Sequence, residues 1–560
     1  MLTSWGEKLD LDAPLPEYPR PQLRRNSYLN LNGRWDYAIR SDSQIPGEFD
    51  GEIIVPFSPE SELSGVSRTL LPHQTLFYRR SIVFEPGFLS ERTFLHFGAV
   101  DQIATIYFNG NNLGTFESCY LPFSVDITDF IRDENELIVA VKDYSDSSYY
   151  SRGKQKQKRG GIWYGCQSGI WQTVWVESVP KDYISGLDIW PNFDAGKVSI
   201  TVKSPSYMPC FIDFEGTTLE GLTNEPITLP VCDFIPWSPE NPRLYPFAAR
   251  LGEDRIESYF AMRKFGVAPD ENNIPRLFLN NKPYFHHGLL DQGYYSDGLY
   301  TPPSDEAMIF DIELAKRLGF NMLRKHIKIE PLRWYYHCDR LGVLVWQDMM
   351  NGGGKYNPII ISAPLVTGIH LKDNHYRLFS RKEEASRRDY TESLKRMIAL
   401  LKNVPSIAMW VPFNEGWGQF DAARAVETIL SCDKSRTIDH ASGWHDQGIG
   451  DVKSLHVYFK KYRFKRDKRN RAVVLSEFGG YNLRIDGHSF NQKDFGYKRF
   501  ASQEELAAAV SALYRNEIAP AVGQGLAASV YTQLSDVEDE LNGLVTYDRR
   551  VVKLANPIVL

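Results

Sequence analysis

Cysteine is scarce in this chain: six of its 560 residues, at positions 119, 166, 210, 232, 338 and 432. These positions contain no Cys-x-x-Cys pair and no Cys/His spacing of a structural metal site, so we expect no metal and no other cofactor. Scattered cysteines of this kind are typical of proteins in a reducing compartment. The sequence therefore predicts a cytoplasmic protein.

Long apolar runs and an excess of basic charge are also absent. No stretch approaches the about 20 apolar residues that cross a bilayer, and residues 1–8 lack the apolar core of a signal peptide. The net charge of −6 does not favour nucleic acid or an anionic membrane. We expect neither a nucleic acid nor a membrane as a partner, and we leave a homo-oligomer open.

Apolar and aromatic side chains are abundant instead, at 42% and 13% of the residues. The length predicts two to four domains with ample core. Residues 1–180 contain short alternating runs, such as 78–84 and 137–142, and the Asn109-Gly110 pair signals a hairpin. This pattern predicts a β-sandwich, and residues 181–270 repeat it in a smaller β unit.

From residue 271 to 560 the pattern changes to strands that alternate with helices. Eight apolar runs qualify as strands: 284–290, 321–326, 344–348, 407–415, 437–443, 455–459, 473–479 and 528–533. Helical patterns between them cover 304–318, 332–341, 387–402, 420–432 and 503–518. Such alternation is typical of a (β/α)8 TIM barrel. The predicted fold class is therefore a multidomain β plus α/β protein.

Two segments do not fit a compact barrel. Residues 350–381 form a long loop with three consecutive glycines and no clear periodicity. Long loops on the catalytic face of a barrel are usually lids or walls of the site. Residues 460–471 carry a run of lysine and arginine. We interpret this run as a solvated loop or an oligomer contact, and contact with an acidic substrate or partner is the alternative.

Two glutamates, Glu415 and Glu477, each close a predicted barrel strand. A buried carboxylate is costly unless it is hydrogen-bonded or faces a cleft. In TIM barrels the catalytic groups lie at the C-terminal ends of the strands. Two carboxyl groups in such places are the minimum set of catalytic groups for cleaving a glycosidic bond. A helix cap is the alternative interpretation of the Asn414-Glu415 pair.

These features resemble the retaining exo-β-glycosidases of glycoside hydrolase family 2, which include β-galactosidases, β-glucuronidases and β-mannosidases. The resemblance covers nearly the whole chain. Its motifs lie at 31–35, 168–172, 237–245, 414–415, 476–479 and 548–549. It implies a jelly-roll sugar-binding domain at 1–180, an immunoglobulin-like sandwich at 181–270 and a catalytic TIM barrel at 271–560.

By this resemblance, Glu415 is the general acid/base and Glu477 the nucleophile of a double displacement. Two close carboxylates raise the pKa of one of them, which supplies the acid. Asn414 would hydrogen-bond the sugar 2-hydroxyl. Tyr458 would donate to the nucleophile, and core packing is its alternative role.

Four polar residues are further candidates for binding the sugar. Arg324 and His326 resemble the family's second-strand pair, although the family spaces them one residue further apart. Asp348 resembles a β-mannosidase segment and would hold a sugar hydroxyl or orient Arg324. Asp291 follows the first strand, where galactosidases are rich in histidine. For His326, a structural role is the alternative.

Two aromatic residues complete the expected site. Trp417 directly follows the acid/base and is a candidate for contact with the substrate or its leaving group. Tyr531 stands where the family often has a tryptophan platform on the eighth strand. Both rings can stack on a sugar face, and packing in the core is the alternative for Trp417.

The sugar itself is predicted to be neutral. Glucuronidases of the family engage the sugar carboxylate with an Asn-x-Lys pair, but here the aligned residues are Glu540-Leu-Asn542. We favour a β-galactosidase-like enzyme, with β-mannosidase and α-L-arabinopyranosidase as close variants. The basic run 460–471 keeps β-glucuronidase as an alternative. A carbohydrate-binding protein on a decayed glycosidase scaffold is the alternative of another class.

Overall fold

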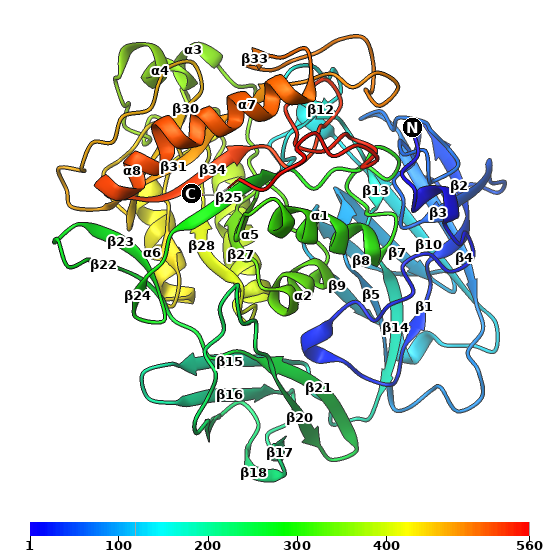
Figure 1. The fold of residues 1–560 in the computed structure, drawn as a ribbon. Coiled ribbons are helices and arrows are strands. Elements are labelled where there is room, and N and C mark those ends of the chain that lie inside the picture. Colours follow the sequence, from blue (N-terminus) through cyan, green and yellow to red (C-terminus); the bar gives the residue numbers. More distant parts are fainter. Residues whose placement is uncertain (118, 559) are drawn as a thin grey trace.

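The computed structural model describes residues 1–117, 119–558 and 560, and it comprises two β-rich parts followed by a barrel (Figure 1). In that view the N-terminal part lies to the right, the second part at the bottom, and the barrel fills the left and the centre. None of the helices in the described ranges combines the length and the hydropathy that a membrane crossing needs.

The N-terminal part is a β-sandwich. Its larger sheet has the strand order β3-β2-β4-β10-β7-β8, and its smaller sheet has the order β1-β14-β5-β9. The strands are β1 (Leu29–Asn30), β2 (Gly33–Arg40), β3 (Gly51–Val55), β4 (Thr75–Ile82), β5 (Arg92–Phe97), β7 (Ile103–Phe108), β8 (Asn111–Glu117), β9 (Phe123–Asp126), β10 (Asn135–Lys142) and β14 (Val174–Val179). Alternate side chains such as Leu76, Ile106 and Val139 are fully buried between the sheets, as the period of two requires.

One segment of the sandwich reaches the barrel. It contains the short strands β11 (Gln155–Lys156) and β12 (Tyr164–Gly165), which pair with each other. The strands β6 (Val100–Asp101) and β13 (Gly169–Ile170) pair beside it. The backbone N–H groups of Arg152 and Gly153 both donate to the Asn351 carbonyl, at 3.0 and 3.3 Å. This segment is therefore fixed on the loop that follows the third barrel strand.

The second part is a smaller β-sandwich. Its sheets have the orders β15-β16-β19 and β18-β17-β20-β21. The strands are β15 (Gly186–Asn192), β16 (Lys197–Lys203), β17 (Pro209–Phe214), β18 (Thr217–Leu222), β19 (Pro226–Pro230), β20 (Tyr245–Leu251) and β21 (Asp254–Phe260). A separate sheet of β22 (Phe265–Pro269), β23 (Pro275–Leu279) and β24 (Lys282–Pro283) leads into the barrel. We propose 1–180, 181–270 and 271–560 as the bounds of the three domains.

The barrel contains eight parallel strands in the order β29-β28-β27-β26-β25-β34-β31-β30. They are β25 (His286–Asp291), β26 (Met322–Lys325), β27 (Leu344–Asp348), β28 (Ile407–Val411), β29 (Thr437–Ile438), β30 (Val452–Val457), β31 (Ala472–Gly479) and β34 (Leu526–Thr532). The Asp451 N–H donates to the Ile438 carbonyl at 3.0 Å and so joins the two ends of the sheet. The predicted fold class, a multidomain β protein with a TIM barrel, is confirmed.

Helices connect the barrel strands along the chain. They are α1 (Asp305–Arg317), α2 (Leu332–Leu341), α3 (Pro358–Ile361), α4 (Ala363–Thr367), α5 (Glu384–Leu401), α6 (Ala422–Cys432), α7 (Gln503–Leu513) and α8 (Ala519–Gln524). Local sequence sets their ends. The Ser304 hydroxyl accepts from the Ala307 N–H and starts α1, and Gly342 ends α2 at a φ of 75°.

Several predicted bounds are wrong. The strand expected at 407–415 ends at Val411, because Pro412 has no N–H to continue the ladder. The strand expected at 437–443 contains only Thr437–Ile438. The helix expected at 503–518 changes after Leu513 into a π-helical turn, η5 (Tyr514–Ile518). The loop at 350–381 contains α3 and α4.

Candidate active site

The two predicted catalytic glutamates meet at the mouth of the barrel. Glu415 lies four residues beyond β28, with a φ of 51°, and its N–H donates to the Ser442 carbonyl at 2.8 Å. A left-handed φ at a residue other than glycine is strained and persists only where its surroundings hold it. Glu477 lies in β31, where the register with β30 and β34 shifts, and such bulges re-aim side chains. The two glutamates offer oxygens within 4.8 Å of each other.

His456 lies between the two carboxylates. Its Nδ1 is 2.7 Å from a Glu415 oxygen and 3.4 Å from a Glu477 oxygen, and its Nε2 is 3.1 Å from the Ser442 hydroxyl. Burial alone raises the pKa of Glu415, but the hydrogen bond and the charge of His456, helped by Lys154, lower it overall. These contacts therefore favour the ionised form of Glu415.

Two donors bind the side-chain oxygens of Glu477. Arg324 Nη1 donates to one oxygen at 3.1 Å, and the Tyr458 hydroxyl donates to the other. Tyr458 also lies 3.0 Å from the Thr532 hydroxyl. A cation and a hydroxyl donor both stabilise the charged form of a carboxylate. The sequence predicted this contact of Tyr458.

Arg324 binds three of the predicted residues, namely Glu477, Asp348 and Asn414. Its guanidinium makes a bidentate contact with Asp348 at 3.0 and 2.9 Å, and it donates to the Asn414 side-chain oxygen at 2.8 Å. The Asn414 amide nitrogen is thereby turned toward the site. Asp348 also contacts His326 Nδ1 at 2.7 Å, so its oxygens bind protein groups. Of the two roles predicted for Asp348, the structure favours the orientation of Arg324.

His326 presents its second ring nitrogen to the site. Burial, followed by the charges of Lys154 and Arg324, lowers the pKa of His326 well below its usual range, so the ring is neutral. With Nδ1–H donating to Asp348, Nε2 is an acceptor, and no donor from the described residues reaches it. A sugar hydroxyl can donate to this nitrogen.

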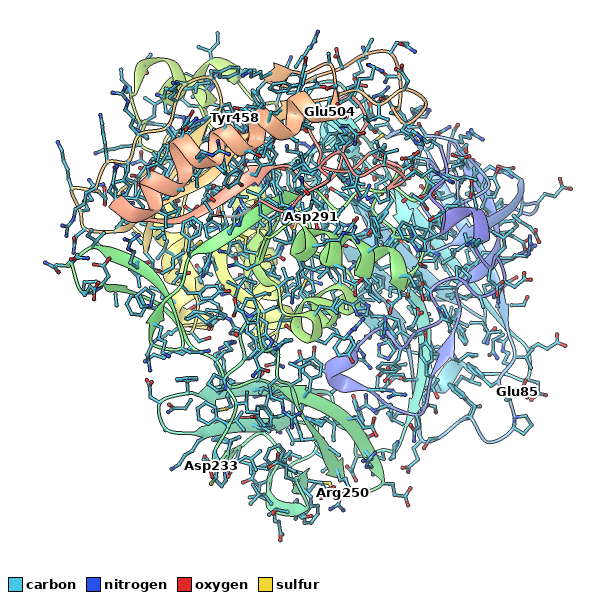
Figure 2. The ribbon with its side chains drawn as sticks, in the orientation of Figure 1. Glu85, Asp233, Arg250, Asp291, Tyr458 and Glu504 are labelled. Atoms are coloured by element: carbon cyan, nitrogen blue, oxygen red, sulfur yellow. The ribbon has the colours of Figure 1, made fainter. Side chains whose placement is uncertain are left out.

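Asp291 and Tyr531 do not reach the site as predicted. Asp291, marked in Figure 2 at the end of β25, accepts from Lys325 at 2.6 Å and from the Gly293 N–H at 2.9 Å, and it is buried. The Tyr531 ring is also buried, 5.7 Å from the Phe478 ring and 6.5 Å from the Tyr514 ring.

Strand alternation explains the error at Tyr531. Successive side chains of a strand point to opposite faces, and in β34 it is Thr532 that contacts Tyr458. Tyr531 therefore points outward to the helical layer, where it packs with Tyr514 of η5, and it cannot stack on a sugar.

Besides His456, Lys154 is a residue without an earlier assignment whose charge acts on Glu415. Lys154, on the sandwich segment fixed to the barrel, places its amine 5.7 Å from the centre of the Tyr164 ring. The Tyr164 hydroxyl donates to Glu540. Burial raises the pKa of Glu540, and Lys154 and Tyr164 oppose this rise. Within the described chain, no ion pair joins Lys154 to Glu540.

A sequence pattern points to each of His456 and Lys154 as a candidate site residue. His456 stands two residues before Tyr458, so the period of two puts both side chains on the same face of their strand. Lys154 belongs to a basic, glycine-containing segment, 152–161, inside an otherwise regular β domain. That signal marks a loop but does not show which neighbour the loop touches.

A cleft of about 360 Å³ opens outward from Glu415 and is lined mostly by aromatic side chains, among them Trp163, Trp417 and Phe459. Trp417 donates to Glu415 at 3.2 Å. Leu365 of the long loop also lines it, whereas no described residue of 460–471 does. The polar site around the two glutamates thus adjoins a mostly apolar cleft.

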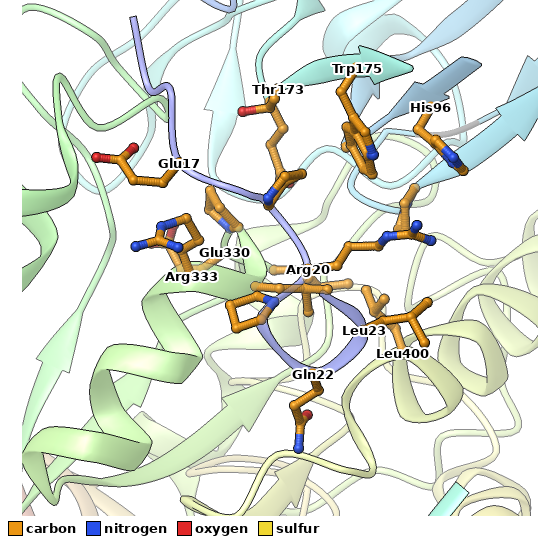
Figure 3. Close-up of a pocket in the computed structure, with 18 of the residues that line it drawn as sticks. Glu17, Arg20, Gln22, Leu23, His96, Thr173, Trp175, Glu330, Arg333 and Leu400 are labelled. Carbon is orange, nitrogen blue, oxygen red and sulfur yellow. The ribbon is translucent and has the colours of Figure 1, made fainter. Parts of the chain in front are cut away.

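Another cavity, of about 340 Å³, lies between the two β-rich parts and the barrel (Figure 3). The N-terminal arm bearing Arg20, Gln22 and Leu23 runs through it, and Trp175, His96 and Arg333 lie around it. Neither Glu415 nor Glu477 is among its described lining residues, so it is not the candidate active site.

Glu415, His456 and Glu477 are also spaced so that they could hold a metal ion. Arg324 and Tyr458, however, already donate to both oxygens of Glu477. A cation beside Arg324 would meet a like charge. The expectation that the protein needs no metal stays a prediction.

These features define a TIM-barrel protein with two preceding β-sandwiches and a paired-carboxylate site. Two family models match the chain: "glycosyl hydrolase 2 galactose-binding domain-like" over residues 56–175 and "glycosyl hydrolases family 2, TIM barrel domain" over residues 276–478. The chain belongs to glycoside hydrolase family 2. The resemblance noted in the sequence is confirmed.

Individual relatives are distant. The β-galactosidase of Leuconostoc mesenteroides subsp. mesenteroides is 24% identical over 463 residues, which cover 72% of this chain and 41% of that protein. The chain thus spans about two fifths of the length of the curated relatives it matches.

Two solved structures share the fold over nearly the whole chain. The Ruminococcus gnavus β-glucuronidase in complex with uronic isofagomine has a TM-score of 0.74 at 16% identity and covers 96% of this chain and 97% of that chain. The Eisenbergiella tayi β-galacturonidase bound to galacturonate has a TM-score of 0.70 at 18% identity and covers 95% and 96%. At such identity these likenesses show the fold alone.

Proposed function

We propose that this chain is a retaining exo-β-glycosidase that removes a terminal, neutral, β-linked sugar. The observation that carries this proposal is the separation of the carboxylates, whose oxygens lie within 4.8 Å. Retaining enzymes place the two carboxyl groups about 5–5.5 Å apart, whereas inverting enzymes leave about 6.5–9.5 Å for a water molecule. The intact pair argues against the alternative of a decayed, non-catalytic scaffold.

We propose a separate step for each glutamate. A Glu477 oxygen attacks the anomeric carbon, while Glu415 gives a proton to the leaving oxygen, so the glycosidic C–O bond breaks as a glycosyl ester forms. Glu415 then takes a proton from water, and that water displaces Glu477 from the sugar. His456, whose Nδ1 lies 2.7 Å from a Glu415 oxygen, would orient that carboxyl group toward the leaving oxygen.

Other residues would position the sugar. The Asn414 amide nitrogen is free to donate because its oxygen is bound to Arg324. A hydrogen bond to the 2-hydroxyl at this place strengthens as charge develops in the transition state. His326 Nε2 would accept a hydroxyl, and Lys154 would donate to one from the sandwich side.

We favour a β-galactoside as the substrate. The curated relative from Leuconostoc mesenteroides is named a β-galactosidase, whereas the two solved structures described above are named a β-glucuronidase and a β-galacturonidase. A neutral sugar can place hydroxyls between Lys154 and Glu540. These hydroxyls would accept a hydrogen bond from Lys154 and donate one to Glu540. β-Mannosidase, α-L-arabinopyranosidase and β-glucuronidase activities are the alternatives.

We also propose a cytoplasmic location, on the basis of the scattered cysteines, and leave a homo-oligomer open.

Aryl β-galactoside turnover should exceed aryl β-glucuronide turnover by at least about tenfold in kcat/KM, since about 1.4 kcal/mol corresponds to one decade. A C6 carboxylate beside Glu540 would meet a like charge in a buried site. The measurement is kcat/KM for both 4-nitrophenyl glycosides. The Glu540→Gln variant should lower the ratio of kcat/KM for the galactoside to kcat/KM for the glucuronide. The Glu253→Gln variant, which changes an exposed glutamate, serves as the control. Equal or reversed preference in the wild type contradicts a neutral-sugar pocket.

The product should be a single monosaccharide, released from the non-reducing end. Leu365 of the long loop and Trp163 of the sandwich both line the cleft beside Glu415, so the site is walled by two separate segments. A walled pocket admits a chain end rather than an internal unit. Chromatography of the products from a β-galacto-oligosaccharide should show galactose from the earliest time points. Internal fragments that appear before any monosaccharide contradict exo action.

A further inference from the structure

The cleft beside Glu415 is unusually apolar for a protein surface. It is lined by aromatic and aliphatic side chains from well-separated parts of the chain, including Trp163, Leu365, Trp417, Trp444, Phe459 and Tyr497. The Phe459 side chain is 72% exposed and Leu365 is 46% exposed. Single exposed apolar residues are ordinary, but a contiguous apolar patch in a concave site indicates something that binds there.

The rings form two ordered walls. On one wall the Trp163 and Trp417 rings meet edge to face at 5.1 Å. On the other, Tyr458 and Tyr497 stack at 3.9 Å, and Phe459 meets Tyr497 at 5.2 Å. Aromatic pairs packed in this way have little rotamer freedom, so the walls are in place before a ligand arrives.

The cleft has little capacity for hydrogen bonds. Among its described lining residues, Glu415 and His456 are the ones with ionisable acid or base groups at neutral pH, and none is an amide, serine, threonine, lysine or arginine. The Trp417 N–H already donates to Glu415, and the Tyr458 hydroxyl to Glu477, so the remaining side-chain donors of the lining are the Trp163 and Trp444 N–H groups and the Tyr497 hydroxyl. A second sugar in this place would leave several hydroxyls without protein partners, and each buried unpaired group is costly.

The position of the cleft identifies which part of a substrate would occupy it. Glu415 lines the cleft, whereas Glu477 is not among its described lining residues. The acid protonates the leaving oxygen, so the leaving group must lie on the side of Glu415. The cleft therefore lies on the side of the site that the leaving group would occupy.

We propose that this cleft is a binding site for planar aromatic leaving groups, so that the preferred substrates are aryl glycosides rather than oligosaccharides. The proposal rests on the exo-glycosidase function proposed above and names its leaving-group class. The Trp163–Trp417 pair and the Phe459–Tyr497 pair both line this cleft, so a flat ring system bound there would contact aromatic side chains and need few hydrogen bonds.

The kinetic test compares leaving groups of very different size on one sugar. In Phe459→Ser, kcat/KM for 2-naphthyl β-galactoside should fall about tenfold or more, whereas kcat/KM for β-galactosyl fluoride should stay within about twofold, because fluoride does not enter the cleft. Tyr207→Ser, which removes an aromatic ring 64% exposed in the second part, should change neither value. Equal losses on both substrates, no loss on either, or a greater loss on a β-galactosyl disaccharide would overturn the proposal.

A binding measurement separates this proposal from the proposed activity. Calorimetry should show free 2-naphthol binding the Glu477→Gln protein at least about tenfold more tightly than glucose, and Phe459→Ser should remove that difference. Binding of 2-naphthol by a protein that hydrolyses no glycoside would overturn the activity and keep the aromatic site. Hydrolysis without any preference for 2-naphthol over glucose would overturn the aromatic site and keep the activity.

Discussion

Replacement of Glu477 by glutamine should lower kcat/KM for an aryl β-galactoside by at least about four decades. The change removes the attacking oxygen, and loss of a covalent nucleophile leaves only the residual catalysis due to binding and electrostatics. It also removes the charge that faces Arg324 and Tyr458. Steady-state kinetics gives the loss, and thermal unfolding of the same sample shows whether the variant folds.

A covalent label tests the same role in the wild-type protein. A 2-deoxy-2-fluoro β-galactoside with a good leaving group slows the second step more than the first, so the glycosyl ester accumulates. Intact mass should increase by one fluorosugar, and a peptide map should place it on Glu477. Glu253→Gln, a change of an exposed glutamate, should keep full activity and full labelling. A label on another residue, or a first product with inverted configuration by NMR, would assign the nucleophile elsewhere.

The sequence predicted the centre of this site better than its surroundings. Glu415, Glu477, Asn414 and Tyr458 lie at or just beyond barrel strand ends, and a repeated βα pattern brings such ends to one mouth. The contacts of Arg324 with Asp348 also follow from adjacent parallel strands, because β26 pairs with β27. These residues are placed by local pattern and barrel geometry alone.

The residues that were missed or misplaced depend on information beyond that pattern. The orientation of Tyr531 turns on the register of the last strand, where one residue decides between the pocket and the helical layer. Asp291 has the right place in the chain, but Lys325 of the next strand neutralises it. Lys154 and Trp163 approach the barrel only because the sandwich docks on the loop after β27, and domain docking leaves no periodic signal in the sequence.

We propose Glu415 rather than Glu477 as the acid because their surroundings differ. Arg324 and Tyr458 both donate to Glu477, whereas Glu415 contacts the imidazole of His456 and lines the open cleft. When a substrate displaces water from the cleft, the burial that already opposes ionisation of Glu415 increases, so protonation of Glu415 becomes easier.

Replacement of Glu415 by glutamine should separate substrates by their leaving groups. For a glycoside of an alkyl alcohol, kcat/KM should fall by about 10²–10⁴-fold, the usual contribution of general acid catalysis. For 2,4-dinitrophenyl β-galactoside, which leaves without a proton, kcat/KM should fall by less than about tenfold. Its kcat should fall strongly, because the base of the second step is missing. The fall in kcat/KM with rising pH that is due to ionisation of Glu415 should disappear in the variant.

Azide provides the decisive control for that role. In Glu415→Ala, the small anion can enter the space left beside the glycosyl ester and attack without a base, so it should raise kcat for the dinitrophenyl substrate and yield β-galactosyl azide. The wild-type protein should not respond, because Glu415 repels the anion. Trp417 contacts Glu415 at 3.2 Å, so Trp417→Phe, which replaces the indole by a smaller aromatic ring without an N–H, tests for indirect damage and should retain dependence on Glu415. Equal losses on both leaving groups, with no rescue by azide, would show that Glu415 positions the substrate rather than transferring a proton.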